Sequence, residues 1–120
     1  MALTLEVDGG LRVVDTAAGR PKVGISFVKS LTITESQIGQ STVIASAGTW
    51  TVSFAQITAA KAIAVKTTGV ATLTLTVNSQ ACTIRVNTHF LLIDSGGGIT
   101  AASITQSTGS DMTVEVDLVG

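Results

Sequence analysis

Polar and apolar residues alternate one by one along much of this chain, and this period constrains the fold more than any other feature. Met112, Val114, Val116 and Leu118 alternate with polar residues near the C-terminus, and residues 70–77 place threonine at every second position. A β-strand points successive side chains to opposite faces, so each such run has one face to bury and one to expose. The sequence therefore predicts an all-β fold.

Other parts of the chain carry the same signal. Two further alternating sets are Leu3, Leu5 and Val7, and Trp50, Val52 and Phe54. Shorter strand-like runs cover residues 23–27, 31–34, 42–45, 62–66, 82–86, 90–94 and 99–105. Abundant threonine and valine favour strands, because β-branched side chains suit a pleated surface. No run has a sustained helical period; residues 35–40 are interpreted as a loop, and residues 56–61 as a segment able to hold one helical turn.

Short glycine-containing segments separate the predicted strands. Turns are predicted at Gly9-Gly10, at Thr68-Gly69, over residues 96–98 and over residues 108–111. Many short strands joined by frequent turns are typical of an antiparallel sandwich, of which the jelly roll is one form. We therefore expect a single antiparallel β-sandwich domain over residues 1–120.

The charge content is low for a globular chain. Charged residues make up 12% of the sequence, about half the usual share, while apolar residues make up 45%. The exposed surface must then consist largely of threonine, serine, alanine and glycine. Such a surface loses little hydration energy when a partner covers it, because few ions are desolvated. This composition favours permanent assembly with other proteins, and we expect a homo-oligomer.

The charges and the N-terminus also exclude several classes of protein. Seven basic and eight acidic residues give a net charge of −1 without a basic cluster, so nucleic acid is not an expected partner. The N-terminus lacks the basic and apolar regions of a signal peptide, and no run approaches the roughly twenty apolar residues of a spanning helix. We expect synthesis in a cytoplasm and no membrane partner. The single Cys82 allows no internal disulfide.

A catalytic interpretation would use Cys82 and His89 as a thiol–imidazole pair, with Asp94 orienting the ring. The alternative places Cys82 on one face with Ile84 and Val86, where a free cysteine behaves as a small buried hydrophobe. We favour burial and expect no enzymatic activity.

The sequence does not favour a phosphate-binding site, a metal site or an aromatic stacking site. The glycines at 96–98 precede a strand-like Ile99 instead of the helix that phosphate-binding motifs require. Asp94, Asp111 and Asp117 are far apart in sequence and form no calcium-loop motif. We expect no cofactor and no metal. Aromatic residues make up 3% of the chain, and Trp50 is in phase with apolar neighbours, which favours a core or subunit-interface position over an exposed stacking platform.

The second half of the chain has a regular order of strands and turns. Residues 57–78, 90–105 and 108–116 read as a strand, a glycine turn, a strand ending at Asn78, another strand, Gly-Ile-Thr at 98–100, a strand, Gly-Ser-Asp at 109–111 and a last strand. This order resembles that of a type of small virion protein from tailed bacteriophages. It implies a β-sandwich that decorates or cements a capsid. The implied partners are the major capsid protein or other virion proteins, and the implied location is the capsid exterior after assembly in the host cytoplasm. A tail or baseplate component, or a receptor- or carbohydrate-binding module of a fibre, is the alternative.

The N-terminal strand is the predicted contact segment. Leu3, Leu5 and Val7, together with Trp50, are the predicted protein-interface residues. The glycines at 9–10 would act as a hinge that lets residues 1–8 reach a neighbour. Residues 1–8 would otherwise form an ordinary edge strand of the sandwich, and the sequence leaves both interpretations open.

Overall fold

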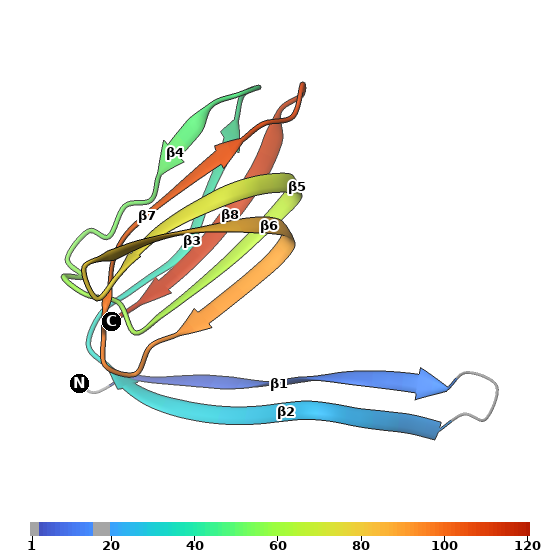
Figure 1. Cartoon of the computed structure of the whole chain (residues 1–120). Coiled ribbons are helices and arrows are strands. Elements are labelled where there is room, and N and C mark those ends of the chain that lie inside the picture. Colours follow the sequence, from blue (N-terminus) through green and yellow to red (C-terminus); the bar gives the residue numbers. More distant parts are fainter. Residues whose placement is uncertain (1–2, 16–19) are drawn as a thin grey trace. The chain divides into compact units, whose positions relative to one another are not determined.

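The computed structural model describes the backbone of residues 3–15 and 20–120, and the side chains of residues 4–6 and 30–120. Its strands are β1 (Leu3–Asp15), β2 (Arg20–Ile33), β3 (Ser36–Ile44), β4 (Thr49–Thr51), β5 (Ala62–Val77), β6 (Gln80–Ile93), β7 (Ile99–Gln106) and β8 (Met112–Val119) (Figure 1). Every strand pairing is antiparallel, which confirms the predicted all-β antiparallel fold. The chain forms two compact units, Met1–Ile33 and Thr34–Gly120.

The first unit is a two-stranded ribbon of β1 and β2. Pairing runs from Leu3 opposite Ile33 to Asp15 opposite Arg20, so the N-terminal strand is longer than predicted. Gly9 and Gly10 lie inside β1, and the predicted turn at this point is wrong. The register shifts just after Gly10, and glycine is a common residue at such irregularities because it tolerates unusual backbone angles.

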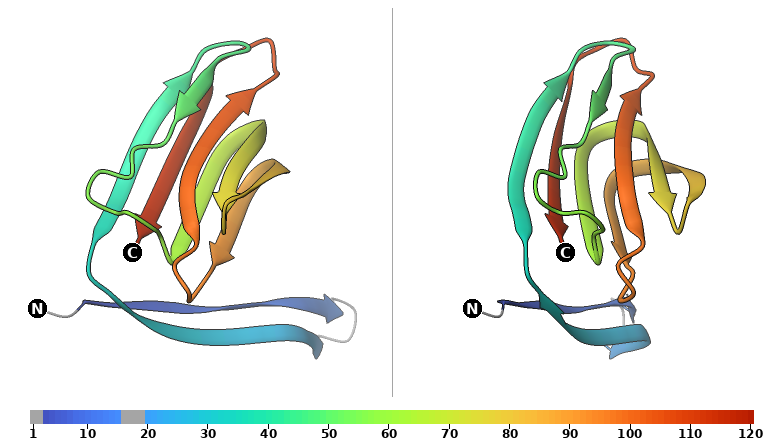
Figure 2. Two further views of the ribbon diagram at one scale, coloured as in Figure 1. Left: turned by 60° about the vertical axis from the view of Figure 1, so that its left-hand side comes forward. Right: turned by 90° about the vertical axis from the view of Figure 1, so that its left-hand side faces the viewer.

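The second unit is an antiparallel sandwich of residues 34–120, whereas the sequence-based expectation was one sandwich domain over residues 1–120. The first half of β5 pairs with β8 and its second half with β7, while β6 pairs with β5 along both halves. One sheet therefore has the order β3–β8–first half of β5–second half of β6. The other has the order β4–β7–second half of β5–first half of β6. This is the strand order of a jelly roll, and Figure 2 shows β5 and β6 curving from one layer into the other.

The corner of β5 is held by a buried threonine. The pairing of β5 with β6 shifts register between Lys66 and Val70, where the strand bends. The Thr67 hydroxyl donates to the carbonyl oxygen of Gly69 (2.6 Å) and accepts the N–H of Thr88 on β6 (3.1 Å). β5 thus continues through residues 68–69, and the predicted turn there is wrong.

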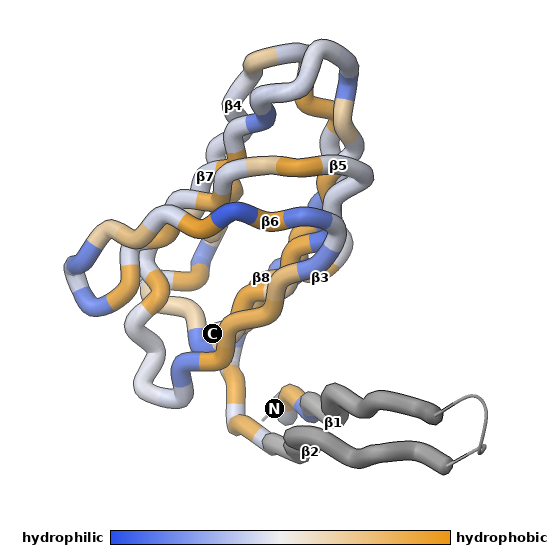
Figure 3. Tube along the Cα trace, turned by 45° about the vertical axis from the view of Figure 1, so that its right-hand side comes forward, coloured by the Kyte–Doolittle hydropathy of each residue, from blue (hydrophilic) through white to orange (hydrophobic). Residues whose placement is uncertain are grey.

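The core lies between the two sheets and follows the predicted alternation. Met112, Val114, Val116 and Leu118 are all buried, whereas the intervening residues of β8 are exposed. Figure 3 shows apolar residues recurring along the strands. The largest fully buried apolar side chains are Ile63, Leu73, Leu75, Ile99, Ile104, Val114, Val116 and Leu118. Burial of each contributes roughly 1.5–3 kcal/mol to the free energy of unfolding.

Two segments differ from their sequence-based interpretation. Residues 35–40 were expected to form a loop, but β3 begins at Ser36 and contains a bulge, in which Ile38 and Gly39 lie opposite Asp117. Gly39 has a φ of 79°, a conformation that favours glycine. The bulge interrupts the alternation of polar and apolar residues, so the sequence pattern does not indicate a strand here. The two runs predicted at 82–86 and 90–94 belong to one strand, β6.

Candidate protein-interaction surfaces

The structure does not bring Cys82, His89 and Asp94 together. Cys82 lies opposite Leu75 near the start of β6, and His89 lies opposite Lys66 in the second half of that strand. At about 3.3 Å per residue, they are roughly 20 Å apart along the strand. The Nδ1 atom of His89 is 3.0 Å from the hydroxyl of Thr88, not from a thiol or a carboxylate. The thiol–imidazole pair considered from the sequence is absent.

Cys82 is exposed, so the predicted burial of this residue is wrong. It shares a face with the buried Leu75, its partner on β5. However, within residues 34–120, β6 is the last strand of its sheet, and Cys82 is only two residues from the strand's start. Alternation identifies the face of a strand, but it does not show whether a second layer covers that face.

The glycine run after β6 forms a turn, as predicted, and the structure shows that the Asp94 carboxylate organises it. The Oδ1 atom of Asp94 accepts the N–H of Gly96 (3.0 Å), and its Oδ2 atom accepts the N–H of Gly98 (3.2 Å). Gly97 has a φ of 71°, and a Cβ atom at Gly98 would collide with the Asn78 side chain. The glycines are therefore explained by the turn itself. In the part of the chain with described side chains, no group of three or more His, Cys, Asp or Glu could hold a metal ion.

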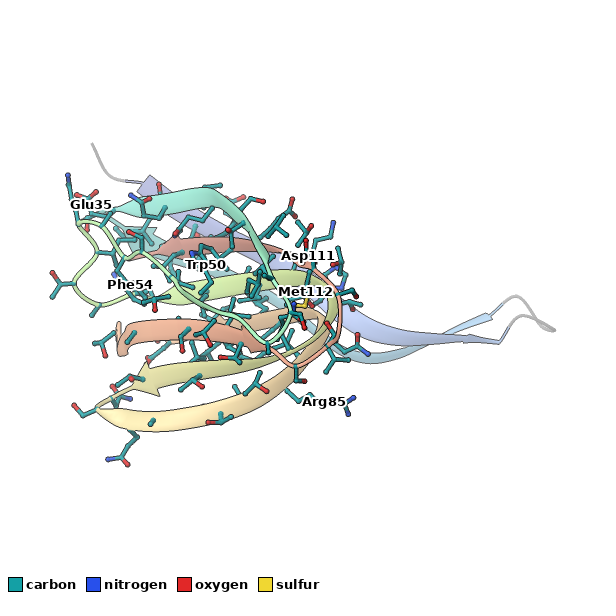
Figure 4. The ribbon with its side chains drawn as sticks, turned by 90° about the horizontal axis from the view of Figure 1, so that it is seen from above. Glu35, Trp50, Phe54, Arg85, Asp111 and Met112 are labelled. Atoms are coloured by element: carbon teal, nitrogen blue, oxygen red, sulfur yellow. The ribbon has the colours of Figure 1, made fainter. Side chains whose placement is uncertain are left out.

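The predicted interface residues have different surroundings. Leu5 is half-buried, and the side chains of Leu3 and Val7 lie outside the described residues. Trp50 is half-buried and packs against the core together with Phe54 (Figure 4). The indole thus belongs mainly to the interior of the sandwich.

The outer face of the sheet formed by β4, β7, the second half of β5 and the first half of β6 is covered by small polar side chains. We call it the threonine face. It consists of Thr49, Thr51, Thr72, Thr74, Thr76, Ala81, Thr83, Arg85, Ala101, Ser103 and Thr105. Arg85, which projects from β6 in Figure 4, is the one charged residue in this set.

Strand register creates this face from separate stretches of sequence. Thr74 lies opposite Thr83 on one side and Ser103 on the other, and Ser103 lies opposite Thr51. The hydroxyls of Thr49 and Thr105 are 2.8 Å apart, a cross-strand pair that orients both side chains. The alternating threonines of β5 are visible in the sequence. The lateral continuation across four strands is visible only in the structure.

The outer face of the other sheet carries charges around a hollow, which we call the charged hollow. Ser41, Glu115, Lys66 and His89 form one row across β3, β8, β5 and β6. In the next row, Asp117, Ala64 and Leu91 lie side by side on β8, β5 and β6, next to Gly39 of the bulge. The hollow measures about 540 Å³. It forms because Ala64 and Gly39 are small, whereas the residues around them are long.

The same sheet exposes large apolar side chains. Ile38 is 63% exposed, Val43 is 59% exposed and Leu91 is 44% exposed. Ile38 and Val43 are on β3, and Leu91 is on β6 at the hollow. The Gly39 N–H donates to Oδ1 of Asp117 (2.8 Å), which fixes this carboxylate at the margin of the hollow. Apolar and charged groups are therefore combined on one side of the sandwich.

The threonine face and the charged hollow are two candidate surfaces of residues 34–120, and Cys82, His89 and Asp94 do not come together there. Among these residues, no helix is long and apolar enough to cross a bilayer. In comparisons with known proteins, no family model, no curated protein and no solved structure matches the chain.

Proposed function

We propose that this chain is a non-enzymatic structural protein of a tailed-phage virion. It decorates or cements the capsid by binding where major capsid subunits meet. The observation that carries the proposal is the threonine face, a surface assembled from four strands that holds one charged side chain, Arg85.

A face of this composition suits burial against another protein. Covering a charged side chain without a partner costs several kcal/mol, whereas a threonine hydroxyl keeps part of its bonding through cross-strand partners such as Thr49 and Thr105. The pleated sheet also holds the small side chains in fixed rows, so little side-chain entropy is lost on binding. A partner can therefore cover this face with a small loss of hydration free energy and side-chain entropy.

The mechanism is passive. A protein that binds only the assembled lattice, and not the separate subunits, stabilises the lattice by mass action. Many copies acting at subunit junctions increase the work needed to separate neighbouring capsid subunits. No chemical step is required of Cys82, His89 or Asp94, which the structure keeps apart.

A glycan-binding role in a tail fibre is less well supported. Sugar-binding sites commonly stack ligands on exposed aromatic rings. Within residues 34–120, Trp50, Phe54 and Phe90 all pack against the core cluster. These rings are partly buried against the core, so they do not form an exposed stacking platform on this part of the chain, and its surface is better suited to protein contacts than to sugar contacts.

Imaging of purified virions with and without the protein tests the proposal. We expect density for the protein at the junctions between capsid subunits, and lower resistance to heat in particles that lack it. Thr74→Lys, which places a charge in the middle of the threonine face, should weaken binding to stripped particles by about tenfold or more.

Thr113→Lys is the matched control, because Thr113 is an exposed strand threonine outside that face. Both variants should unfold at wild-type denaturant concentrations, which separates loss of binding from loss of fold. Virions without the protein, or equal binding by the two variants, would contradict the proposal.

A further inference from the structure

We infer that β6 of one copy pairs antiparallel with β6 of a second copy, through residues 81–87 and about a twofold axis at Ile84. The inference uses residues 34–120 alone and goes beyond the proposed function, because it names a contact between copies of this chain. Its evidence is the open edge of β6, the direction of the backbone groups along that edge, and the apolar side chains exposed beside it.

Among the end strands of the sandwich, β6 has the least protected edge. β4 is three residues long, and β3 is interrupted by the bulge at Ile38 and Gly39. Short strands and bulges keep sheet edges from pairing with other chains. Within residues 34–120, β6 pairs only with β5, without a register shift from 80 to 87. Residues 81–87 contain no proline and one charged residue, Arg85, so this edge is open to a further strand.

The two ends of β6 show which backbone groups point away from β5. Successive residues of an antiparallel strand direct their N–H and C=O groups to opposite neighbours. Residues 78–79 form a two-residue turn with φ of 50° and 64°, and such a turn directs the Gln80 N–H to the Val77 carbonyl on β5. At the other end, the Asp94 N–H donates to the carbonyl oxygen of Lys61 (2.7 Å), again toward β5. The residues at the free edge are therefore Ala81, Thr83, Arg85 and Asn87.

A twofold register centred on Ile84 uses all four of these residues. It pairs Ala81 with Asn87 and Thr83 with Arg85 in both directions, and each pair exchanges two backbone hydrogen bonds. An axis at Thr83 would set Asn87 opposite the turn, and an axis at Arg85 would set two guanidinium groups opposite each other. Because both sides of the contact come from the same strand, the partner of β6 is necessarily a second molecule.

The same register covers apolar side chains that the sandwich leaves accessible. Cys82 is exposed and Ile84 is half-buried, although both lie on the face of β6 that is turned to the core. In the pair, Ile84 lies opposite Ile84 of the second copy, and Cys82 lies opposite Val86. These are non-hydrogen-bonded pairs, whose side chains approach most closely, so apolar burial adds to the backbone hydrogen bonds.

The other face of β6 also fits this pairing. Thr83 lies opposite Arg85 of the second copy, so no charged side chain meets a like charge there. The threonine face then continues across the axis onto the second copy. The contact is isologous, with the same patch on both copies, and it closes as a dimer.

Two substitutions at Thr83 in the full chain test the register. In sedimentation velocity, the wild type should pass from monomer to dimer as its concentration rises. Thr83→Glu places a carboxylate opposite Arg85 of the second copy and should strengthen the dimer by about threefold or more, because opposite charges facing each other across a strand pair stabilise it. Thr83→Lys places like charges there and should weaken the dimer by about the same factor. The matched controls Thr113→Glu and Thr113→Lys, at an exposed position of β8, should leave association unchanged.

Disulfide trapping tests the position of the axis. Two Ile84 residues that face each other in a non-hydrogen-bonded pair have Cα atoms about 4.5 Å apart, a separation that a disulfide can span. Ile84→Cys/Cys82→Ser should therefore give a covalent dimer under mild oxidation, whereas the control Thr113→Cys/Cys82→Ser should not. The Thr83 variants change an exposed side chain, so they test the inference even if Ile84→Cys unfolds the sandwich.

A wild-type protein that stays monomeric at every concentration would overturn the inference, and pairing of β1 or β2 with β6 of the same copy would give that result. Equal effects of Thr83→Glu and Thr83→Lys, or equal trapping of the two cysteine variants, would overturn it too. Neither assay contains virus particles, so the outcomes are independent of the proposed location. A dimer with no protein in virions would reject the proposed function alone. Capsid binding by a protein that does not self-associate would reject this inference alone.

Discussion

At the scale of single residues, the most informative side chain is a buried glutamine. Gln106 is 0% exposed on β7. Its Nε2 group donates to the carbonyl oxygens of Ile44 and Ser110, each at 2.8 Å. Its Oε1 atom accepts the N–H of Thr108 (3.0 Å) and the hydroxyl of the same residue. One side chain thereby ties the end of β3 to the turn between β7 and β8.

Gln106→Leu should lower the free energy of unfolding by about 3 kcal/mol, since it keeps the volume but removes the hydrogen bonds of the buried amide to two carbonyl oxygens and one N–H. Urea unfolding followed by tryptophan fluorescence measures this loss. Gln56→Leu, at an exposed position in a loop, is the control and should change stability by less than about 0.5 kcal/mol. Equal stability of the two variants would show that the network around Gln106 contributes little.

At the scale of elements, the bend in β5 determines how the strands divide between the two sheets. Thr67 links the bend to β6 through the N–H of Thr88, a residue with a φ of 79°. The bond spans the point where strand pairing is interrupted, between Lys66 and Val70. The two halves of β5 can then belong to different sheets, while the Thr67 hydroxyl and the Thr88 N–H each keep a hydrogen-bond acceptor.

Thr67→Val should destabilise the fold by about 1–2 kcal/mol, because valine keeps the shape but removes both hydrogen bonds of the hydroxyl. Thr113→Val is the matched substitution at an exposed strand position and should be neutral or slightly stabilising. Denaturant midpoints of the two variants give the comparison. A neutral Thr67→Val would mean that the corner is held by packing alone.

Strands with unbroken alternation could be predicted from the sequence, and the irregular points could not. β8 and the second half of β5 match the prediction, because each has one covered face. Glycine was ambiguous, since it suits turns, bulges and bends: Gly9, Gly39 and Gly69 all lie within strands. Separating these cases requires the pairing partners, which are distant in sequence.

The same limit applies to the candidate surfaces. The low charge and the threonines of β5 were evident in the sequence, but the charged hollow depends on Ala64, Asp117 and Leu91 meeting from three strands. Cys82 was placed in the core because its face was recognised, whereas its exposure follows from the position of β6 at the sheet edge. Local periodicity determines the face of a residue, and tertiary structure determines what covers that face.

At the scale of the whole molecule, the chain divides into a ribbon and a sandwich with its own core. The residues of the core cluster all lie between Ile44 and Leu118. The sandwich therefore contains what a domain of its size needs to fold.

A chain of residues 34–120 alone should fold and unfold cooperatively, because removing residues 1–33 takes away no member of the core cluster. Near-UV circular dichroism of Trp50 and thermal unfolding measure this. We expect a near-UV spectrum close to that of the full chain and a single sharp transition. A spectrum without tertiary signal would show that the sandwich depends on the first 33 residues.

The passage of β5 and β6 through both sheets has a mechanical consequence. In a sandwich whose layers are joined only by surface loops, a sideways load can make one sheet slide over the other along the apolar seam. Here two adjacent strands carry covalent backbone around the corner, so the load passes into peptide bonds and into the ladder between β5 and β6. Sliding would then require many hydrogen bonds to break at once. We therefore expect this construction to resist shear between its layers, a property that would suit the capsid-binding role proposed above.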